Sequence, residues 1–112
     1  MRADLIHGHL DLLVLSVLAG GAAHGYAMAE ELRRRSGGEL DLREGTLYPA
    51  LYRLEAAGLL SSAWLQAGGR RRRMYRLTRP GRRALERQRN EWSAFARTVT
   101  QVIGEKAWIG PA

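Results

Sequence analysis

The sequence predicts a mainly α-helical fold with one small β-hairpin and a long helix at its C-terminal end. Apolar residues recur at helical spacing through most of the 112 residues, but residues 59–66 and 72–78 instead favour strands and flank a glycine-rich turn. Residues 79–103 keep an apolar repeat of about seven residues. The chain is long enough for one domain with a core of modest size. We expect residues 1–78 to form this domain, 79–103 to form a helix that projects from it, and 104–112 to form a short tail.

Three helices are expected before the hairpin. The first spans residues 4–19, with Asp4 able to cap it, and it is apolar on more than one side, which predicts contacts with its own domain and with a second subunit. The second spans residues 25–35 and should bury Tyr26, Ala29 and Leu32. A compact connection leads to the third helix near residues 45–57, so the second and third helices have the arrangement of a helix-turn-helix.

The third helix is expected to have two different faces. Leu47, Leu51 and Leu54 fall in one stripe at about 100° per residue, which predicts a core face with Ala50 and Ala57 at its edge. The opposite face holds small residues, one aromatic hydroxyl and one guanidinium: Gly45, Pro49, Tyr52, Arg53 and Ala56. Small side chains allow a close approach, and the polar ones can donate to phosphates or base edges. A core helix with an idle outer side is the alternative.

Pro49 constrains the start of this helix because it cannot donate to the carbonyl of Gly45. The helix is expected either to begin near Gly45 or Thr46, with Pro49 in its first turn, or to be irregular there. Thr46 and Tyr48 then lie near the amino end, where free N–H groups and the helix dipole favour a phosphate. Gly58 is expected to close the helix.

The hairpin carries a run of four arginines, Arg70 to Arg73. The turn is expected over residues 67–71, which would leave these arginines at the tip and edge of the hairpin, reaching for phosphates or a minor groove. Met74, Tyr75 and Leu77 should anchor the returning strand. The alternative is a solvated charge run that protects an edge strand. The run adjoins a candidate recognition helix in a chain with 18 Lys and Arg, 11 Asp and Glu and a net charge of +7, so nucleic acid is favoured.

The last helix is expected over residues 79–103, with Thr78 as its cap and Pro80 tolerated in its first turn. Its seam of apolar residues is too long for so small a domain to cover, which predicts a dimerisation helix rather than packing wholly within the subunit. With the first helix added, the candidate dimer interface comprises Leu10, Leu13, Val14, Val17, Leu85, Trp92, Phe95, Ala96, Val99, Val102 and Ile103.

Trp92 interrupts this seam with a bulky ring. Its helical neighbours Gln88 and Ala96 are polar or small, and such a seam tends to leave space. We expect either a tentative pocket for a small aromatic effector at Trp92 and Gln88, or a tryptophan with a purely structural role.

A family resemblance rests on several of these stretches. Residues 44–49, Glu-Gly-Thr-Leu-Tyr-Pro, with Arg53-Leu54-Glu55 and Gly58-Leu59-Leu60, resemble the recognition-helix signature of the PadR family of bacterial transcriptional regulators. Gly69, the arginine run and residues 75–78 resemble that family's wing. Together with Leu10 to Leu18 and His24-Gly25-Tyr26, the resemblance covers about residues 8–103. Arg72-Arg73-Met74 departs from the family, in which an aromatic residue often precedes the tyrosine.

The resemblance implies a winged helix-turn-helix fold and a homodimeric repressor that binds a palindromic operator in double-stranded DNA and is released in many members by a small molecule. The expected DNA-contact residues are Tyr26, Glu44, Gly45, Thr46, Tyr48, Pro49, Tyr52, Arg53, Arg70, Arg71, Arg72 and Arg73. A nonspecific nucleic-acid packaging protein and a protein-binding winged helix are the alternatives.

Several other classes of protein are disfavoured. The chain has no cysteine and only three histidines, and it lacks a phosphate-binding glycine motif, so neither an enzyme nor a cofactor is expected. His7 and His9 point to nearly opposite sides of a helix; His7 with Asp11 could hold a metal, but solvated side chains explain these residues and none is expected. The longest apolar run is too short to span a membrane. We expect a soluble cytoplasmic protein.

Overall fold

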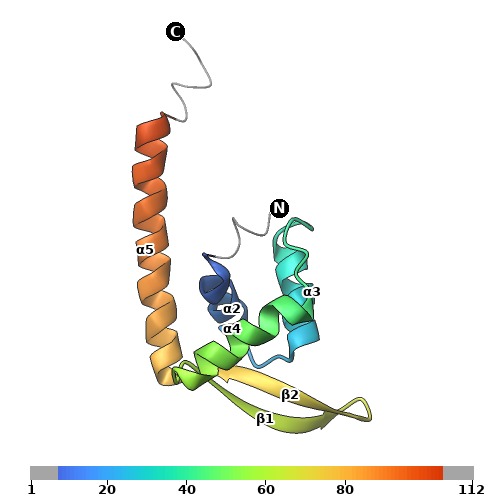
Figure 1. Ribbon diagram of the computed structural model, residues 1–112. Helices are drawn as coiled ribbons and strands as arrows, with labels where there is room; N and C mark the ends of the chain where they lie inside the picture. Colours follow the sequence, from blue (N-terminus) through green and yellow to red (C-terminus); the bar gives the residue numbers. More distant parts are fainter. Residues whose placement is uncertain (1–7, 105–112) are drawn as a thin grey trace.

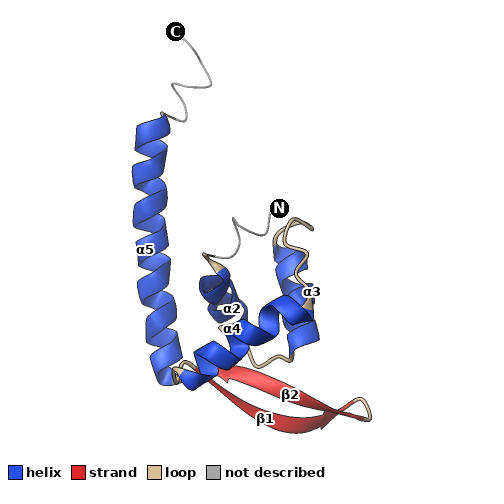
Figure 2. Cartoon of the chain, in the orientation of Figure 1, coloured by secondary structure: helices blue, strands red, loops and turns tan. Residues whose placement is uncertain are grey.

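The computed structural model describes residues 8–104, and within them three helices and a hairpin precede a long helix (Figure 1). The order is α2 (Leu10–Leu18), α3 (Gly25–Arg35), α4 (Glu44–Ala56), β1 (Leu60–Ala67), β2 (Arg70–Leu77) and α5 (Arg79–Ile103). The first three helices pack together beside the hairpin, and α5 extends away from them (Figure 2). This arrangement confirms the predicted fold class, a mainly α winged helix-turn-helix with a long C-terminal helix.

The first helix begins later than the sequence suggested. Residues 8 and 9 form a turn and α2 starts at Leu10, so an unbroken helix over residues 4–19 is wrong. Its expected cap Asp4, the residue His7, for which a metal was considered but not expected, and the tail beyond Gly104 lie outside the described residues. The N-cap residue His9 has a non-helical backbone and makes no side-chain cap hydrogen bond, which is consistent with a helix that starts without a strong sequence signal.

The core lies where α2, α3 and α4 meet the base of the hairpin. The stripe of Leu47, Leu51 and Leu54 is buried as predicted, and Ala50 joins it, whereas Ala57 is exposed. In α3, Leu32 is buried, but Tyr26 is 54% exposed, so its predicted burial is wrong. Met28 fills the core instead, because residues four apart share one face of a helix and Met28 lines up with Leu32.

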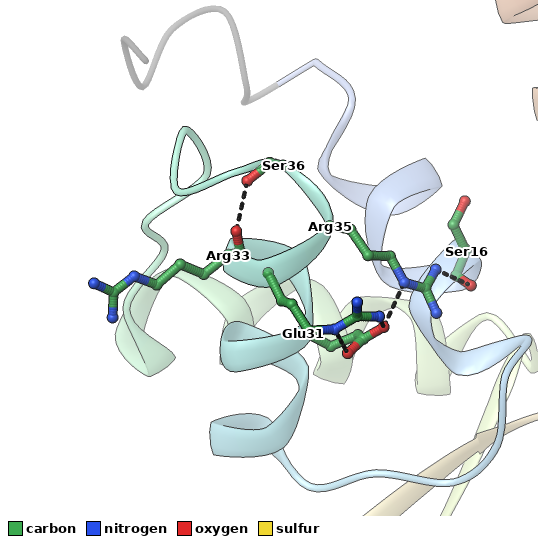
Figure 3. A network of polar contacts seen from close by, with 6 residues as sticks. Ser16, Glu31, Arg33, Arg35 and Ser36 are labelled. Carbon is green, nitrogen blue, oxygen red and sulfur yellow. Dashed lines mark hydrogen bonds and ion pairs between the residues drawn. The ribbon is translucent and has the colours of Figure 1, made fainter.

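Polar contacts tie α3 to α2 at the surface (Figure 3). Glu31 accepts hydrogen bonds from Arg34 and Arg35 at 2.6 Å, and these two guanidinium groups lower the pKa of its carboxyl to about 2. Arg35 also donates to the backbone oxygen of Ser16 at 3.4 Å, which links the two helices. The contact of Glu31 with Arg35 joins residues four apart on the same helix face.

Gly58 ends α4 in the manner predicted for it. Its φ of +79° is left-handed, and its N–H donates to the oxygen of Glu55 at 2.9 Å while that of Leu59 donates to Leu54 at 2.9 Å. This pair of bonds satisfies carbonyls that the last turn of a helix leaves free. The chain then turns directly into β1.

Thr78 and Gly81 join the hairpin to α5. As predicted, Thr78 caps α5: its Oγ1 accepts from the N–H of Gly81 at 3.1 Å, and it also donates to the oxygen of Gly58 at 2.6 Å. Gly81 packs so closely that a Cβ built on it would lie 2.1 Å from the backbone oxygen of Leu59. One joint therefore brings together the end of α4, the start of β1, the end of β2 and the start of α5.

The hairpin turn is tighter than expected. β1 and β2 pair antiparallel from Leu60 with Leu77 to Ala67 with Arg70, and the two residues between the strands, Gly68 and Gly69, have φ of +58° and +78°. Positive φ at both positions suits glycine in a two-residue hairpin turn. The turn is therefore shorter than the predicted 67–71, and all four arginines belong to β2, where their side chains alternate between its two faces.

Most of α5 lies beyond the core of its own chain. Ala84 and Leu85 are buried against the domain, but Trp92, Phe95, Val102 and other apolar residues farther along are exposed, Val102 by 80%. The helix limits 79–103 agree with the prediction. An apolar seam without a cover in its own chain is what the sequence led us to expect.

We predict that Gly81→Ala destabilises the fold. A Cβ at this position must displace the Leu59 backbone, and overpacking of this kind typically costs about 1–3 kcal/mol, more than the roughly 1 kcal/mol that alanine gains over glycine in a helix. Urea denaturation at fixed protein concentration measures the loss. Gly45→Ala in α4 is the matched control, because a Cβ there meets nothing within 4 Å. Equal stability of the two variants would contradict the prediction.

Candidate nucleic-acid interface

Helix α4 begins one residue earlier than the earliest predicted start. Arg43 is its N-cap, and the N–H groups of Thr46 and Leu47 donate to the Arg43 oxygen at 3.0 and 3.2 Å. Pro49 consequently lies in the second turn, not the first. It removes only the bond to Gly45, which is itself exposed, so the helix continues through it.

The outward face of α4 has the composition that the sequence indicated. Gly45, Thr46, Pro49 and Ala56 are all exposed, and Tyr52 is 60% exposed. Small residues along this face leave the helix backbone accessible, with one aromatic hydroxyl standing out from it. A surface of this kind can enter a groove of DNA more closely than one covered by long charged chains.

Tyr48 lies on a different side of α4 from Pro49, turned towards the N-terminus of α3. It is half-buried, its hydroxyl donates to Glu44 at 3.3 Å, and burial followed by the charge of Glu44 raises its pKa. A Cβ on Gly25 would come within 3.0 Å of that hydroxyl. Gly25 therefore allows α3 and the Tyr48 ring to pack together.

The four arginines divide between the two faces of β2. Arg71 and Arg73 are registered opposite Gln66 and Trp64, and Trp64 packs beneath both guanidinium groups at 5.1 and 5.5 Å from its ring centroid. Arg73 also lies 3.8 Å from Glu55 of α4. These two arginines thus face α4 and are held over an aromatic ring.

Arg72, on the other face, reaches α3. Its guanidinium lies 3.4 Å from Nε2 of His24, whose Nδ1 accepts from the N–H of Ala27 and caps α3. Burial, together with the nearby Arg72 charge, lowers the pKa of His24 against an opposing effect of Glu44. A neutral imidazole can keep this cap without repelling the arginine.

A groove of about 720 Å³ separates α4 from the hairpin. It brings together eight of the predicted DNA-contact residues: Tyr26, Glu44, Tyr48, Tyr52, Arg70, Arg71, Arg72 and Arg73. The other four, Gly45, Thr46, Pro49 and Arg53, belong to α4 but do not line it. Aromatic rings and guanidinium groups side by side are suited to a sugar-phosphate backbone, which presents both apolar and anionic surface.

Three residues of this groove escaped the sequence reasoning as site residues: His24, Trp64 and Tyr75. Alternation along β1 places Trp64 on the same face as Leu60 and could have indicated its position. Tyr75 was expected only as an anchor. It is fully buried, its hydroxyl has no hydrogen-bond partner among the described residues, and burial raises its pKa.

Arg53 occupies the side of α4 away from the hairpin. Its Nη2 forms an ion pair with Oδ1 of Asp11 in the first turn of α2. The sequence offered no signal for this contact, because the two residues are 42 positions apart and belong to different helices. This arginine, expected to contact DNA, is therefore engaged by a carboxylate of its own chain.

A second groove, of about 370 Å³, lies between the start of α2 and α5. Both tentative effector residues, Gln88 and Trp92, line it together with His9 and Asp11. The Trp92 ring meets the His9 ring edge to face at 4.9 Å and lies 6.4 Å from that of Phe95. Even without a second subunit, Trp92 thus borders a hollow with aromatic and acidic walls.

Between residues 8 and 104, no three side chains of the metal-ligating kinds come close enough to hold an ion. No helix in that part of the chain is both long and apolar enough to cross a bilayer.

Comparison with known proteins gives consistent matches. The model of the transcriptional regulator PadR-like family matches residues 14–87. The chain is 42% identical over 88 residues to the transcriptional regulator Rv3488 of Mycobacterium tuberculosis, covering 79% of each protein. The crystal structure of a PadR family transcriptional regulator from Eggerthella lenta has a TM-score of 0.79 at 35% identity, covering 89% of this chain and 86% of that one.

The fold is also that of Bacillus subtilis PadR, whose crystal structure was solved in complex with operator DNA. The TM-score is 0.64 at 24% identity, over 70% of this chain and 45% of that one. The family match runs from α2 through the hairpin into α5, and so includes the helices and strands that bound the groove. The chain belongs to the PadR-like family of transcriptional regulators.

Proposed function

We propose that this protein is a sequence-specific DNA-binding repressor that acts as a homodimer on a palindromic operator. The observation that carries the proposal is the groove between α4 and the hairpin, where four arginines, four tyrosines and one tryptophan converge beside an exposed face of small residues. The net charge of +7 favours a polyanionic partner. The operator complex of Bacillus subtilis PadR, a protein of the same fold, supports DNA as that partner.

Each part of the interface has its own task in this proposal. The face of α4 that holds Gly45, Pro49 and Tyr52 enters the major groove and reads bases, and the hairpin follows the adjacent backbone. Arg71 and Arg73, kept over Trp64, are presented to phosphates in a limited range of orientations, which reduces the entropy lost on binding. Residues 1–78 form the DNA-binding domain and residues 79–103 the dimerisation helix.

The dimer is formed chiefly through the far part of α5. Trp92, Phe95, Val102 and Ile103 are exposed large apolar residues on one helix, and such a patch is typical of a subunit interface. Leu10, Val14, Val17 and Leu85 are buried within their own chain, which leaves them little surface for a partner. Of the α2 residues first considered, only Leu13 is half-buried. A two-fold axis would place two recognition helices on a palindrome.

The groove between α2 and α5 is a suitable site for a small aromatic effector that releases the DNA. Trp92 and Phe95 offer aromatic surfaces, while Asp11 and Glu91 supply negative charge, so a planar aromatic cation would match the lining. Binding would affect DNA affinity only if it favoured one arrangement of the two subunits over another.

Selection of bound duplexes from a random DNA pool tests the proposed function. Enrichment of an inverted repeat is expected, with affinity for it at least about 10³-fold above that for scrambled DNA. A nonspecific packaging protein would enrich no sequence.

Arg53→Ala and Arg71→Ala should impair binding in different ways. Arg53→Ala removes a base contact, which relaxes preference at one position of each half-site and costs about 1–3 kcal/mol on the selected sequence. Arg71→Ala removes a phosphate contact, which weakens binding to all duplexes alike and lowers the slope of log affinity against log salt concentration by about one unit. Fluorescence anisotropy against selected and scrambled DNA over a range of salt measures both effects. Equal losses on both duplexes for both variants would refute this division.

Val99→Asp should dissociate the dimer, because it places an unpaired carboxylate in the apolar seam, at a cost of several kcal/mol. Sedimentation equilibrium measures the association constant. Gln101→Asp is the matched control, since it adds the same charge on the opposite side of the exposed end of α5. A folded wild-type protein that sediments as a monomer would rule out the dimer.

A planar aromatic cation should quench the fluorescence of Trp92 saturably and lower operator affinity over the same concentration range. Trp64 and Trp108 are replaced by Phe in the background so that Trp92 is the reporter, and adding Trp92→Ala should abolish the effect on DNA affinity. Quenching without any change in DNA affinity would leave Trp92 as a packing residue.

A further inference from the structure

We infer that Asp11 competes with DNA for Arg53 and thereby holds down the affinity of the protein for its operator. The inference rests on the proposed DNA-binding function and assigns a role to a residue of α2, outside both the recognition helix and the hairpin. Asp11 and Arg53 form a direct ion pair between α2 and α4.

The pair is placed where it can open. The side chain of Arg53 is 59% exposed and that of Asp11 37%, so water and ligands reach both groups. Exposed pairs of this kind are weak, with an equilibrium preference of at most about fivefold. The contact therefore orients the guanidinium in the free protein without locking it.

Arg53 borders the face of α4 that is proposed to read bases. At about 100° per residue it follows Pro49 and Ala56 around the helix, on the side away from Glu55, which faces the hairpin through Ser62 and Arg73. Asp11 therefore draws the guanidinium away from the exposed strip. Rotation of the long arginine side chain alone would bring it back.

DNA must offer Arg53 more than Asp11 does. A single exposed phosphate replaces one carboxylate contact by a similar one, so a random duplex gains little from opening the pair. A guanine edge offers two parallel hydrogen bonds, worth about five- to 150-fold in discrimination between bases. The pair is thus opened by the correct base and remains closed on other sequences, so the cost of opening it falls mainly on the selected duplex.

Asp11→Asn tests this role, with Glu86→Gln as the matched control. Glu86 lies on α5 and forms a comparable exposed pair with Arg89 at 3.5 Å, so both changes remove one negative charge and one surface ion pair. Affinities of the full-length protein for the duplex selected by the wild type and for a scrambled duplex are measured by anisotropy at several salt concentrations. Both changes are repeated in an Arg53→Ala background, and thermal unfolding confirms that each variant is folded.

Asp11→Asn should raise affinity for selected DNA more than for scrambled DNA, raising the specificity ratio by up to about fivefold relative to Glu86→Gln. The difference should vanish in the Arg53→Ala background. The inference is overturned if Asp11→Asn matches Glu86→Gln, if its effect persists without Arg53, or if it weakens only the selected duplex, which would mean that Asp11 prepares Arg53 for binding. A wild type with no sequence preference would refute the proposed function as well; a selective wild type with any of the other three results would refute only the role of Asp11.

Discussion

The joint between Gly58, Leu59, Thr78 and Gly81 determines how the three working parts of the molecule are arranged. Helix α4 ends there, the hairpin leaves and returns there, and α5 starts there, so one set of hydrogen bonds and one close backbone contact orient all three. The groove depends on this joint because its two walls are α4 and the hairpin. The seam on α5 depends on it as well, since the direction of the helix is set at its first turn.

Local signals in the sequence were sufficient for most of the fold. The stripe of Leu47, Leu51 and Leu54 identified the buried face of α4, and Thr78 marked the start of α5, because side-chain spacing and caps act within a few residues. The unpartnered seam of α5 could also be inferred by comparing its length with the small core available. Helix ends that are marked by weaker signals, such as the start of α2, were predicted at the wrong residue.

Contacts between distant segments were beyond local reasoning. The face of α3 that packs inwards is set by its contacts with α2 and α4, and this face carries Met28 and Leu32 while Tyr26 turns outwards. The sequence suggested that the four arginines cluster at the tip and edge of the hairpin. Pairing of the strands instead places them on two faces of β2 with different partners, Trp64 on one and His24 on the other. Most of the residues that line the groove had nevertheless been predicted as DNA contacts from their residue type. The ion pair formed by Arg53 was not, because nothing in the sequence relates it to α2.

The length of α5 makes it a lever. Its 25 residues rise by about 37 Å, and its far end carries the exposed seam while its near end is fixed to the DNA-reading domain through the joint. A change in crossing angle of about 5° between two such helices would move the attached domain by roughly 3 Å, close to the rise of one base pair. A slight repacking of the seam at the far end of α5 would therefore be magnified at the other end of the molecule.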